Sequence, residues 1–212
     1  MTTQPSVRAP RRDAAENREA LLAAARVVLN RDPSGSLETI AAEAGLSRRS
    51  VYGHFATRDD LLRELVALGA NRVVDALATV THPDPLTRLA LIASNLWREV
   101  ESVRMMAVVA VRGPLAKNTA SLLRPIRLSV GDAIRDGQHD GSMRTDLDAA
   151  LLTRLVEDTA LLVLEESSEH PLAARDGHRL VMLMVLGCVG LGWRDAGAFI
   201  DAEPELQWKE RH

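Results

Sequence analysis

The sequence predicts an all-α fold with two parts, a small three-helix head at the amino terminus and a larger helical domain after it. Apolar residues recur at the three- and four-residue spacing of one helix face over most of the chain after residue 12. No segment of useful length alternates apolar and polar residues as a strand does, and turn residues interrupt the helical pattern at short intervals. These observations exclude a fold built around a sheet.

Length and cysteine content set the physical class of the protein. A chain of 212 residues can bury most of a core without covalent staples. The single cysteine, Cys188, excludes a disulfide framework, and its apolar surroundings favour a small buried residue over a nucleophile. The amino terminus has no apolar signal core, and the longest apolar stretch, 180–193, is too short to cross a bilayer. We therefore expect a cytoplasmic protein with no membrane partner.

Charge is distributed locally rather than generally. The formal net charge of −3 argues against a basic coat that binds nucleic acid everywhere. Two segments without an acid, 1–12 and 47–58, each hold three arginines. The arginines of these segments are Arg8, Arg11, Arg12, Arg48, Arg49 and Arg58. They would supply the phosphate attraction on which most protein–DNA affinity depends.

The head begins with a segment that lacks periodicity. Residues 1–12 contain two prolines and small polar residues, so we expect a disordered basic arm. Such an arm is either a solvated tail or a segment that follows DNA phosphates or enters the minor groove. A first helix is expected over 13–30, and 32–35 is a turn signal.

Two short helices joined by a tight turn are expected between residues 36 and 60. Ser36 can cap the first of them, and Gly45 can end it in the left-handed conformation. Ser47 can cap the second at once, so the interruption is only about three residues, as in a helix-turn-helix. The second helix, 48–55, carries a polar, basic side that no apolar residue covers.

This segment resembles the DNA-binding domain of the tetracycline-repressor (TetR) family. The match covers about twenty-five residues, in which spacing, caps and aromatic positions agree together. The matching residues are Ile40-Ala41-x-x-Ala44-Gly45-Leu46-Ser47, then Val51-Tyr52-x-His54-Phe55, then Thr57-Arg58-Asp59-x-Leu61-Leu62. The resemblance implies a DNA-binding head over 13–57.

The expected DNA contacts combine side-chain chemistry with this resemblance. Arg48, Arg49 and Ser50 project from the first turns of the second helix, where an arginine can bind the O6 and N7 atoms of guanine or can touch phosphates only. By resemblance, Tyr52 and His54 touch the DNA backbone, and Thr39, Ser47 and Arg58 contact phosphates. His54 could equally be a core histidine.

A long helix over 58–80 would connect the head to the rest of the chain. Its apolar face is longer than the head alone requires, and the resemblance gives it the role of transmitting movement between domains. The segment 81–85 contains two prolines, and we place the domain boundary near it. The second domain, 81–212, would bind an effector and form the dimer.

Helices are expected throughout the second domain. Their predicted ranges are 85–103, 104–111, 115–136 with a kink at Pro125, 147–168 and 172–196. The loop 137–146 between the third and fourth of these also resembles the corresponding loop of TetR-like regulators.

The last predicted helix is apolar on every side between residues 180 and 193, so it must be covered on every side. A second copy of the chain could cover one side, which favours a homodimer formed by the last two long helices. The alternative is an ordinary buried helix in a monomer. The residues expected at the dimer interface are Leu155, Leu162, Val185, Cys188, Val189 and Gly192.

A small-molecule site is expected inside the second domain, with apolar walls and few polar groups. The candidate residues are Trp97, Met105, Met106, Leu122, Ile126, Leu161 and Asp158. Asp158 shares a helix face with leucines, so it would either bind a cationic or hydroxylated effector or pair internally with Arg154. No histidine spacing suits a metal, no residues suggest an enzyme, and no cofactor is expected.

Together, these features predict a homodimeric transcriptional regulator that binds a near-palindromic double-stranded operator. The resemblance implies a repressor that an effector releases from DNA. The alternative is a helical ligand-binding or partner-binding protein whose head binds DNA weakly or not at all. Three acids just behind the motif, Asp59, Asp60 and Glu64, are the feature that favours this alternative.

Overall fold

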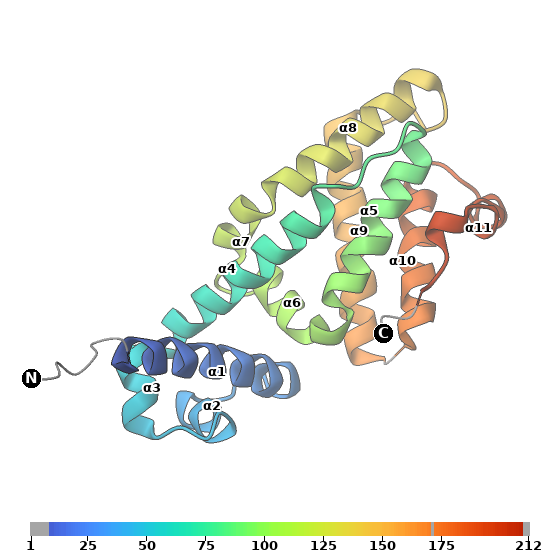
Figure 1. Ribbon diagram of the computed structural model, residues 1–212. Coiled ribbons are helices and arrows are strands. Elements are labelled where there is room, and N and C mark those ends of the chain that lie inside the picture. Colours follow the sequence, from blue (N-terminus) through green and yellow to red (C-terminus); the bar gives the residue numbers. More distant parts are fainter. Residues whose placement is uncertain (1–8, 171, 210–212) are drawn as a thin grey trace, which may run out of the picture. The chain divides into compact units, whose positions relative to one another are not determined.

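The computed structural model describes residues 9–170 and 172–209, and its described part is helical with no strand (Figure 1). The chain divides between Leu68 and Gly69 into two compact units. This division lies inside one helix, α4 (Arg58–Leu77), rather than at the 81–85 break. The reason is that Val73 and Leu77 of α4 belong to the apolar core of the second unit.

The head consists of three helices and the first part of α4. Its helices are α1 (Ala9–Arg31), α2 (Leu37–Glu43) and α3 (Arg48–His54), and each contacts the other two. Helix α1 begins four residues earlier than predicted, so the expected disordered arm is wrong for residues 9–12. The rest of that prediction, for residues 1–8, lies outside the described residues.

The turn between α2 and α3 follows the capping pattern that the sequence predicts. The Ser36 hydroxyl accepts a hydrogen bond from the Thr39 N–H at 3.1 Å, and the Ser47 hydroxyl accepts one from the Ser50 N–H at 3.1 Å. Gly45 has a φ of +67°, and the Leu46 N–H donates to the Ala41 carbonyl at 2.8 Å. These bonds form a Schellman motif, which fixes the angle at which α3 leaves α2.

Helix α4 begins with a reciprocal cap, also as predicted. The Thr57 N–H donates to the Asp60 carboxylate at 3.0 Å, and the Asp60 N–H donates to the Thr57 hydroxyl at 3.1 Å. Arg18 of α1 ties this end of the head together, because its guanidinium donates to the Glu64 carboxylate at 3.0 Å and to the His54 carbonyl at 3.3 Å. It also lies 4.6 Å from the centre of the Phe55 ring.

Four long helices form the centre of the second unit. They are α5 (Pro85–Val100), α8 (Arg124–Asp140), α9 (Ala149–Glu169) and α10 (Ala174–Cys188). Helix α5 packs against α8 and α10, and α9 packs against the same two helices, so the four enclose one core. Shorter helices complete the unit: α6 (Arg104–Arg112), α7 (Ala116–Leu122) and α11 (Trp193–Ala202), with 3₁₀ turns at Glu101–Val103 and Pro204–Leu206.

The helix predicted over 115–136 is two helices rather than one kinked helix. Leu123 separates α7 from α8, and Pro125 lies in the first turn of α8. A proline there costs no hydrogen bond, because the first N–H groups of a helix have no partner inside it. Helix α8 then continues to Asp140 and ends at Gly141, which has a φ of +81°.

The last predicted helix, 172–196, is also two helices. Helix α10 ends at Cys188, and Gly190 adopts a φ of +115°. The Leu191 N–H donates to the Leu186 carbonyl at 3.1 Å, and the Gly190 N–H donates to the Gly187 carbonyl at 3.1 Å. This is the same hydrogen-bond pattern that ends α2. Gly192 then precedes α11 as its N-cap.

The core of the second unit is tight around Trp97. The indole N–H of Trp97 donates to the Ala174 carbonyl at 2.9 Å, and a Cβ atom built on Gly177 would lie 2.0 Å from its ring. Beside it, the Ser94 hydroxyl lies 2.7 Å from Nε2 of His178, and both side chains are buried. Only glycine at position 177 lets α10 approach α5 this closely.

In the part of the chain that the structure describes, no helix is long and apolar enough to span a membrane.

Candidate nucleic-acid interface

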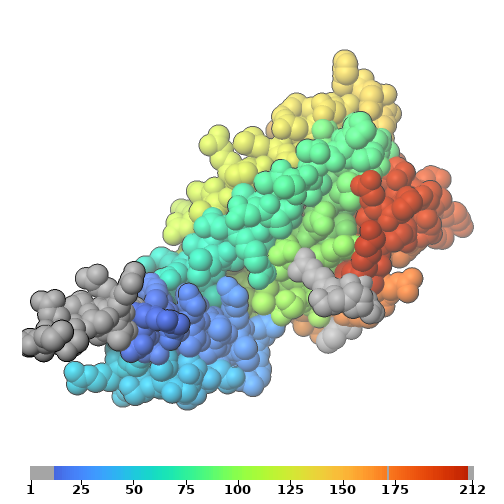
Figure 2. Space-filling view, in the orientation of Figure 1, coloured from blue at the N-terminus to red at the C-terminus, as the bar shows by residue number. Residues whose placement is uncertain are grey.

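Helix α3 presents its first turn to solvent. Ser47, Arg48 and Arg49 are exposed, while Val51 of the same helix is completely buried in the head. The space-filling view shows the surface of the head on which α2 and α3 lie (Figure 2). The basic side predicted from the sequence is therefore an open surface on a rigid support.

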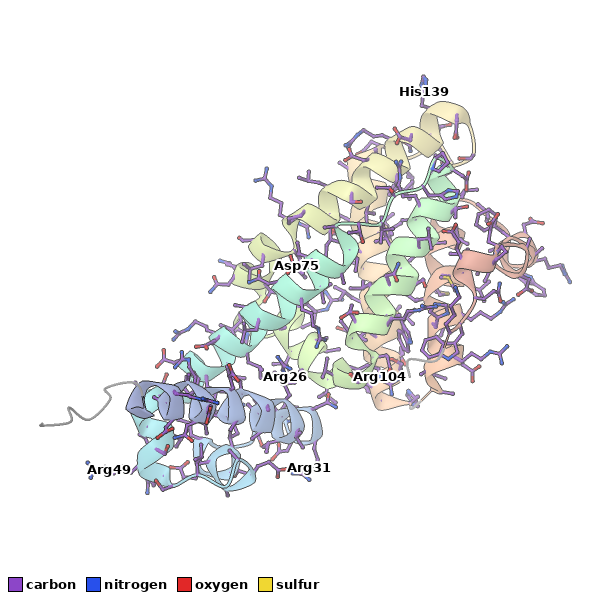
Figure 3. All side chains as sticks on the ribbon, viewed as in Figure 1. Arg26, Arg31, Arg49, Asp75, Arg104 and His139 are labelled. Carbon is purple, nitrogen blue, oxygen red and sulfur yellow. The ribbon has the colours of Figure 1, made fainter. Side chains whose placement is uncertain are left out.

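The two arginines of α3 differ in their surroundings. Arg49 points away from the head (Figure 3), and no hydrogen bond or ion pair of its guanidinium is found among the described residues. Arg48 instead has its Nε atom 3.2 Å from Oε1 of Glu38, and its guanidinium lies 5.6 Å from the centre of the Tyr52 ring. Arg49 is thus free to bind an incoming anion, whereas Arg48 is already paired with the Glu38 carboxylate.

Tyr52 and Glu38 join α3 to α2. The Tyr52 side chain is 44% exposed, and its hydroxyl donates to Oε1 of Glu38 at 2.9 Å. Hydrogen bonds from the Glu38 backbone N–H and the Tyr52 hydroxyl, with the charge of Arg48 nearby, lower the pKa of the Glu38 carboxyl. Glu38 was missing from the sequence-based set of candidates.

The Arg58 guanidinium is hydrogen-bonded inside the head. Its Nε atom donates to the Gly35 carbonyl at 2.9 Å, and one terminal nitrogen donates to the Pro33 carbonyl. The side chain therefore holds the turn between α1 and α2 in place. This placement does not support the phosphate contact expected from the resemblance, because the guanidinium already serves backbone carbonyls.

The remaining candidates in the head fall into two groups. Thr39 is exposed at the start of α2, with its hydroxyl 2.9 Å from that of Ser36. Ser50 and His54 are half-buried. The structure thus brings Thr39, Ser47, Arg48, Arg49 and Tyr52 to the open surface of α2 and α3, and it leaves Ser50 and His54 at its edge.

Two of the three acids behind the motif are engaged within the head. Glu64 accepts hydrogen bonds from Arg18, and Asp60 accepts them from Thr57 and from Arg63, the last at 2.8 Å. The Thr57 hydroxyl and Arg63 lower the pKa of Asp60. Much of the acidic charge that could repel DNA is therefore offset locally.

Comparison with known proteins agrees with this geometry. Residues 21–65 match the family described as "Bacterial regulatory proteins, tetR family". The HTH-type transcriptional repressor LfrR of Mycolicibacterium smegmatis is 37% identical over 101 residues, which span 47% of this chain and 49% of the repressor. The matched residues 21–65 are those of the head and the start of α4, so the likeness to the tetR family lies in the region of the helix-turn-helix.

Solved structures of TetR-family proteins share the fold along most of the chain. A tetR-family regulatory protein from Rhodococcus RHA1 is 20% identical, with a TM-score of 0.68, over 84% of this chain and 98% of that one. LfrR from Mycobacterium smegmatis, solved in complex with proflavine, is 16% identical with a TM-score of 0.62, over 85% of this chain and 99% of that one.

The candidate effector residues differ in their burial. Trp97 and Met106 are buried in the core. Four half-buried side chains, Met105, Leu122, Ile126 and Leu161, come from α6, α7, α8 and α9 in turn. Each of these helices contacts the next, and α6 contacts α9. Trp97 therefore acts as packing, whereas these four side chains remain only partly covered by their own chain.

Asp158 faces away from an apolar interior. Its side chain is exposed, and Oδ1 lies 3.7 Å from Nη1 of Arg112 on α6. The internal pairing considered for Asp158 thus exists, but its partner is Arg112 rather than Arg154. Arg112 also donates to Glu165 at 2.7 Å, and this hydrogen bond raises the arginine's pKa further.

The predicted interface residues also divide into two groups. Leu155 and Leu162 of α9 are 41% and 47% exposed, and Met184 of α10, which was not predicted, is 41% exposed. Val185 and Val189 are buried in the core of their own chain and have no surface that a partner could contact. The prediction that these two residues lie at the dimer interface is therefore wrong. The apolar run covers both the inside and the outside of α10, and sequence alone does not separate the two.

Cys188 and Gly192 lie at the end of α10. The Cys188 sulfur is 3.0 Å from the Thr159 hydroxyl, which joins α10 to α9. Gly192 is exposed and caps α11 instead of lying in a helix–helix contact. Among the described residues, no cluster of three or more histidine, cysteine or acidic side chains could hold a metal ion.

Proposed function

We propose that this protein is a DNA-binding transcriptional regulator of the TetR family, a repressor that a small molecule releases from its operator. One observation carries the proposal: the exposed, positively charged first turn of α3, capped by Ser47 and anchored by buried Val51. A helix so placed can enter the major groove with Arg49 directed at base edges. The open guanidinium of Arg49 makes it the strongest candidate for a base contact.

The same proposal includes a homodimer. Leu155, Leu162 and Met184 expose apolar surface on two neighbouring helices, α9 and α10. A second copy that places the same face against this one would bury it, and the two-fold axis would explain a near-palindromic operator. Two recognition helices would then read major grooves about 34–36 Å apart.

The effector would bind in the second unit, among Met105, Leu122, Ile126 and Leu161. Their partial burial leaves apolar surface that a small molecule can cover. The similar LfrR structure was solved in complex with proflavine, which supports a small-molecule effector. By the logic of linkage, an effector weakens DNA binding only if it prefers the conformation that does not fit the operator.

The test is DNA binding by Arg49→Ala. The probe is the tightest-bound duplex that the wild-type protein selects from a random-sequence library. Loss of the guanidinium should weaken binding by about 10- to 100-fold, the range for a good arginine–guanine pair, and change the preferred base at one position of each half-site. Fluorescence anisotropy at several salt concentrations measures both effects.

Arg31→Ala is the matched control. Arg31 is an exposed arginine of the head whose charge faces Glu43 on α2, at 3.8 Å. It should leave the affinity within about threefold of wild type, since a single exposed ion pair contributes little. A wild-type protein that selects no duplex at low salt would contradict the proposal and favour a ligand-binding or partner-binding protein with an inactive head.

A further inference from the structure

We propose that Glu38 sets how strongly this protein discriminates its operator from other DNA. In the free protein its carboxylate pairs with Arg48 and accepts a hydrogen bond from Tyr52. DNA phosphates must therefore compete with this carboxylate for both side chains. The inference rests on the proposed DNA-binding function and goes beyond it, because neither the motif nor the family match assigns a role to this position.

The geometry is that of an anion already bound to the recognition helix. A single oxygen, Oε1 of Glu38, accepts the Tyr52 hydroxyl at 2.9 Å and lies 3.2 Å from Nε of Arg48. The Arg48 guanidinium lies over the Tyr52 ring, 5.6 Å from its centre. The three side chains thus form one cluster on the exposed surface of α2 and α3.

Glu38 is held in this position from its own side as well. It lies in the first turn of α2, where the helix dipole favours a negative charge. Its own backbone N–H and the Tyr52 hydroxyl lower the pKa of this carboxyl. The charge is therefore fixed close to the surface that DNA would approach, whichever way Arg48 turns.

Non-operator DNA offers Arg48 only phosphates. To bind one, Arg48 must leave Glu38, and the uncovered carboxylate then lies close to the negative DNA backbone. At an operator, Arg48 can exchange Glu38 for two acceptors on one guanine, and this stronger pairing compensates for the loss. Glu38 therefore weakens binding to DNA in general more than binding to the operator.

The contrast with Arg49 isolates this effect. The two arginines are neighbours on one helix turn, and Arg49 has no acid beside it in the described chain. Arg49 can bind DNA without leaving an acid, whereas Arg48 must first leave Glu38 and would contribute mainly where the sequence is correct. One helix turn thus carries one unrestrained arginine and one that Glu38 restrains.

The experiment compares Glu38→Gln with the wild-type protein. Glutamine keeps the size and can still accept the Tyr52 hydroxyl, but it removes the charge. Anisotropy titrations use two duplexes, the one selected by the wild-type protein and a scrambled duplex of the same length and composition. Affinity for the scrambled duplex should rise about 5- to 10-fold, and that for the selected duplex by about twofold or less.

Glu43→Gln is the matched control, because it removes the same charge from the same helix, where the partner is Arg31 at 3.8 Å. It should raise both affinities equally and only slightly. A further variant, Glu38→Gln with Arg48→Ala, should lose the gain on scrambled DNA, since the gain requires a released Arg48.

The outcomes separate this inference from the function on which it rests. A rise in the affinity of Glu38→Gln for scrambled DNA that exceeds its rise for the selected duplex supports the inference. Equal rises, matching Glu43→Gln, would reduce Glu38 to a net-charge effect and overturn it. A fall in affinity for both duplexes would also overturn it, because Glu38 would then support the head or bind DNA itself. No wild-type binding to either duplex would overturn the proposed function as well.

Discussion

The two units of the chain differ in their buried polar groups. All six buried polar side chains of the described residues belong to the second unit. They are Thr87, Ser94, Thr119, Thr153, Ser167 and His178. The head buries none of its described polar side chains to this extent. Both units carry ion pairs at the surface, such as Arg48 with Glu38 in the head and Arg112 with Glu165 in the second unit.

This difference separates what each unit responds to. Surface ion pairs are weakened by salt, whereas buried polar groups respond to packing and to protonation. Salt should therefore weaken ion pairs in both units, whereas volume changes and pH should act through the buried polar groups of the second unit. Tryptophan fluorescence follows the second unit by itself, because all three tryptophans, Trp97, Trp193 and Trp208, belong to it.

The largest expected effect is that of Gly177→Ala on the second unit. The new Cβ would lie 2.0 Å from the Trp97 ring, so either the indole or α10 must move. Such overpacking costs about 3 kcal/mol or more of the free energy of unfolding. Urea unfolding followed by tryptophan fluorescence measures the loss.

Gly69→Ala is the control for Gly177→Ala. A Cβ at Gly69, in the interior of α4, would meet no atom within 4 Å. Alanine there should stabilise the protein by up to about 1 kcal/mol, because it favours the helix more than glycine does. Equal destabilisation by both variants would mean that the contact with Trp97 does not limit packing at position 177.

Acid should destabilise the second unit through His178. The side chain is only 2% exposed, and burial, with the charge of Arg98, lowers its pKa from 6.5 to about 4. Between these values the unfolded chain binds more protons than the folded one, so stability is full above pH 6.5 and falls as pH decreases towards 4. The loss between pH 7.5 and pH 5 should be about 2 kcal/mol.

Urea titrations at pH 7.5, 6 and 5, again with tryptophan fluorescence, test this slope. His178→Gln should flatten it, even if the variant is less stable at every pH. His139→Gln should leave it unchanged, because His139 is exposed at the end of α8 (Figure 3). A wild-type stability that stays constant over this range would show that His178 titrates normally.

The smallest of these effects is expected for Leu162→Ala at the proposed dimer interface. Truncating this 47% exposed side chain should leave the stability of each protomer nearly unchanged and weaken the dimer about tenfold, or about 1–2 kcal/mol. Sedimentation equilibrium measures the dissociation constant. Leu128→Ala on α8 removes an equally exposed leucine outside the proposed face, and dissociation of this control to the same degree would place the interface elsewhere.

Two glycines show how far local sequence signals extend. Gly45 and Gly190 end α2 and α10 with the same hydrogen-bond pattern. Gly45 was recognised because Ser47 caps the next helix and polar residues surround the turn. Gly190 lies inside a continuous apolar run, where periodicity gives no boundary, so one long helix was predicted where two exist.

Pairings between distant residues were beyond the sequence pattern. Arg58 donates to carbonyls 23 and 25 residues away, and the resemblance gave no sign that its guanidinium would be engaged. Glu38 and Tyr52 are 14 residues apart on two helices, and only the angle of the turn brings them together. The sequence predicts Trp97 in the wall of a binding site, and the structure places it in the core, because core and wall residues share one apolar pattern.

Tyr52 has a consequence for experiments because it is the one tyrosine of the chain. Incorporating fluorinated tyrosine throughout the protein labels a single position, the Tyr52 ring of α3 over which the Arg48 guanidinium lies. One fluorine resonance would then report whether the Glu38 cluster is closed, opened by DNA or altered by an effector bound in the other unit. The protein thus carries its own spectroscopic sensor at the place where recognition begins.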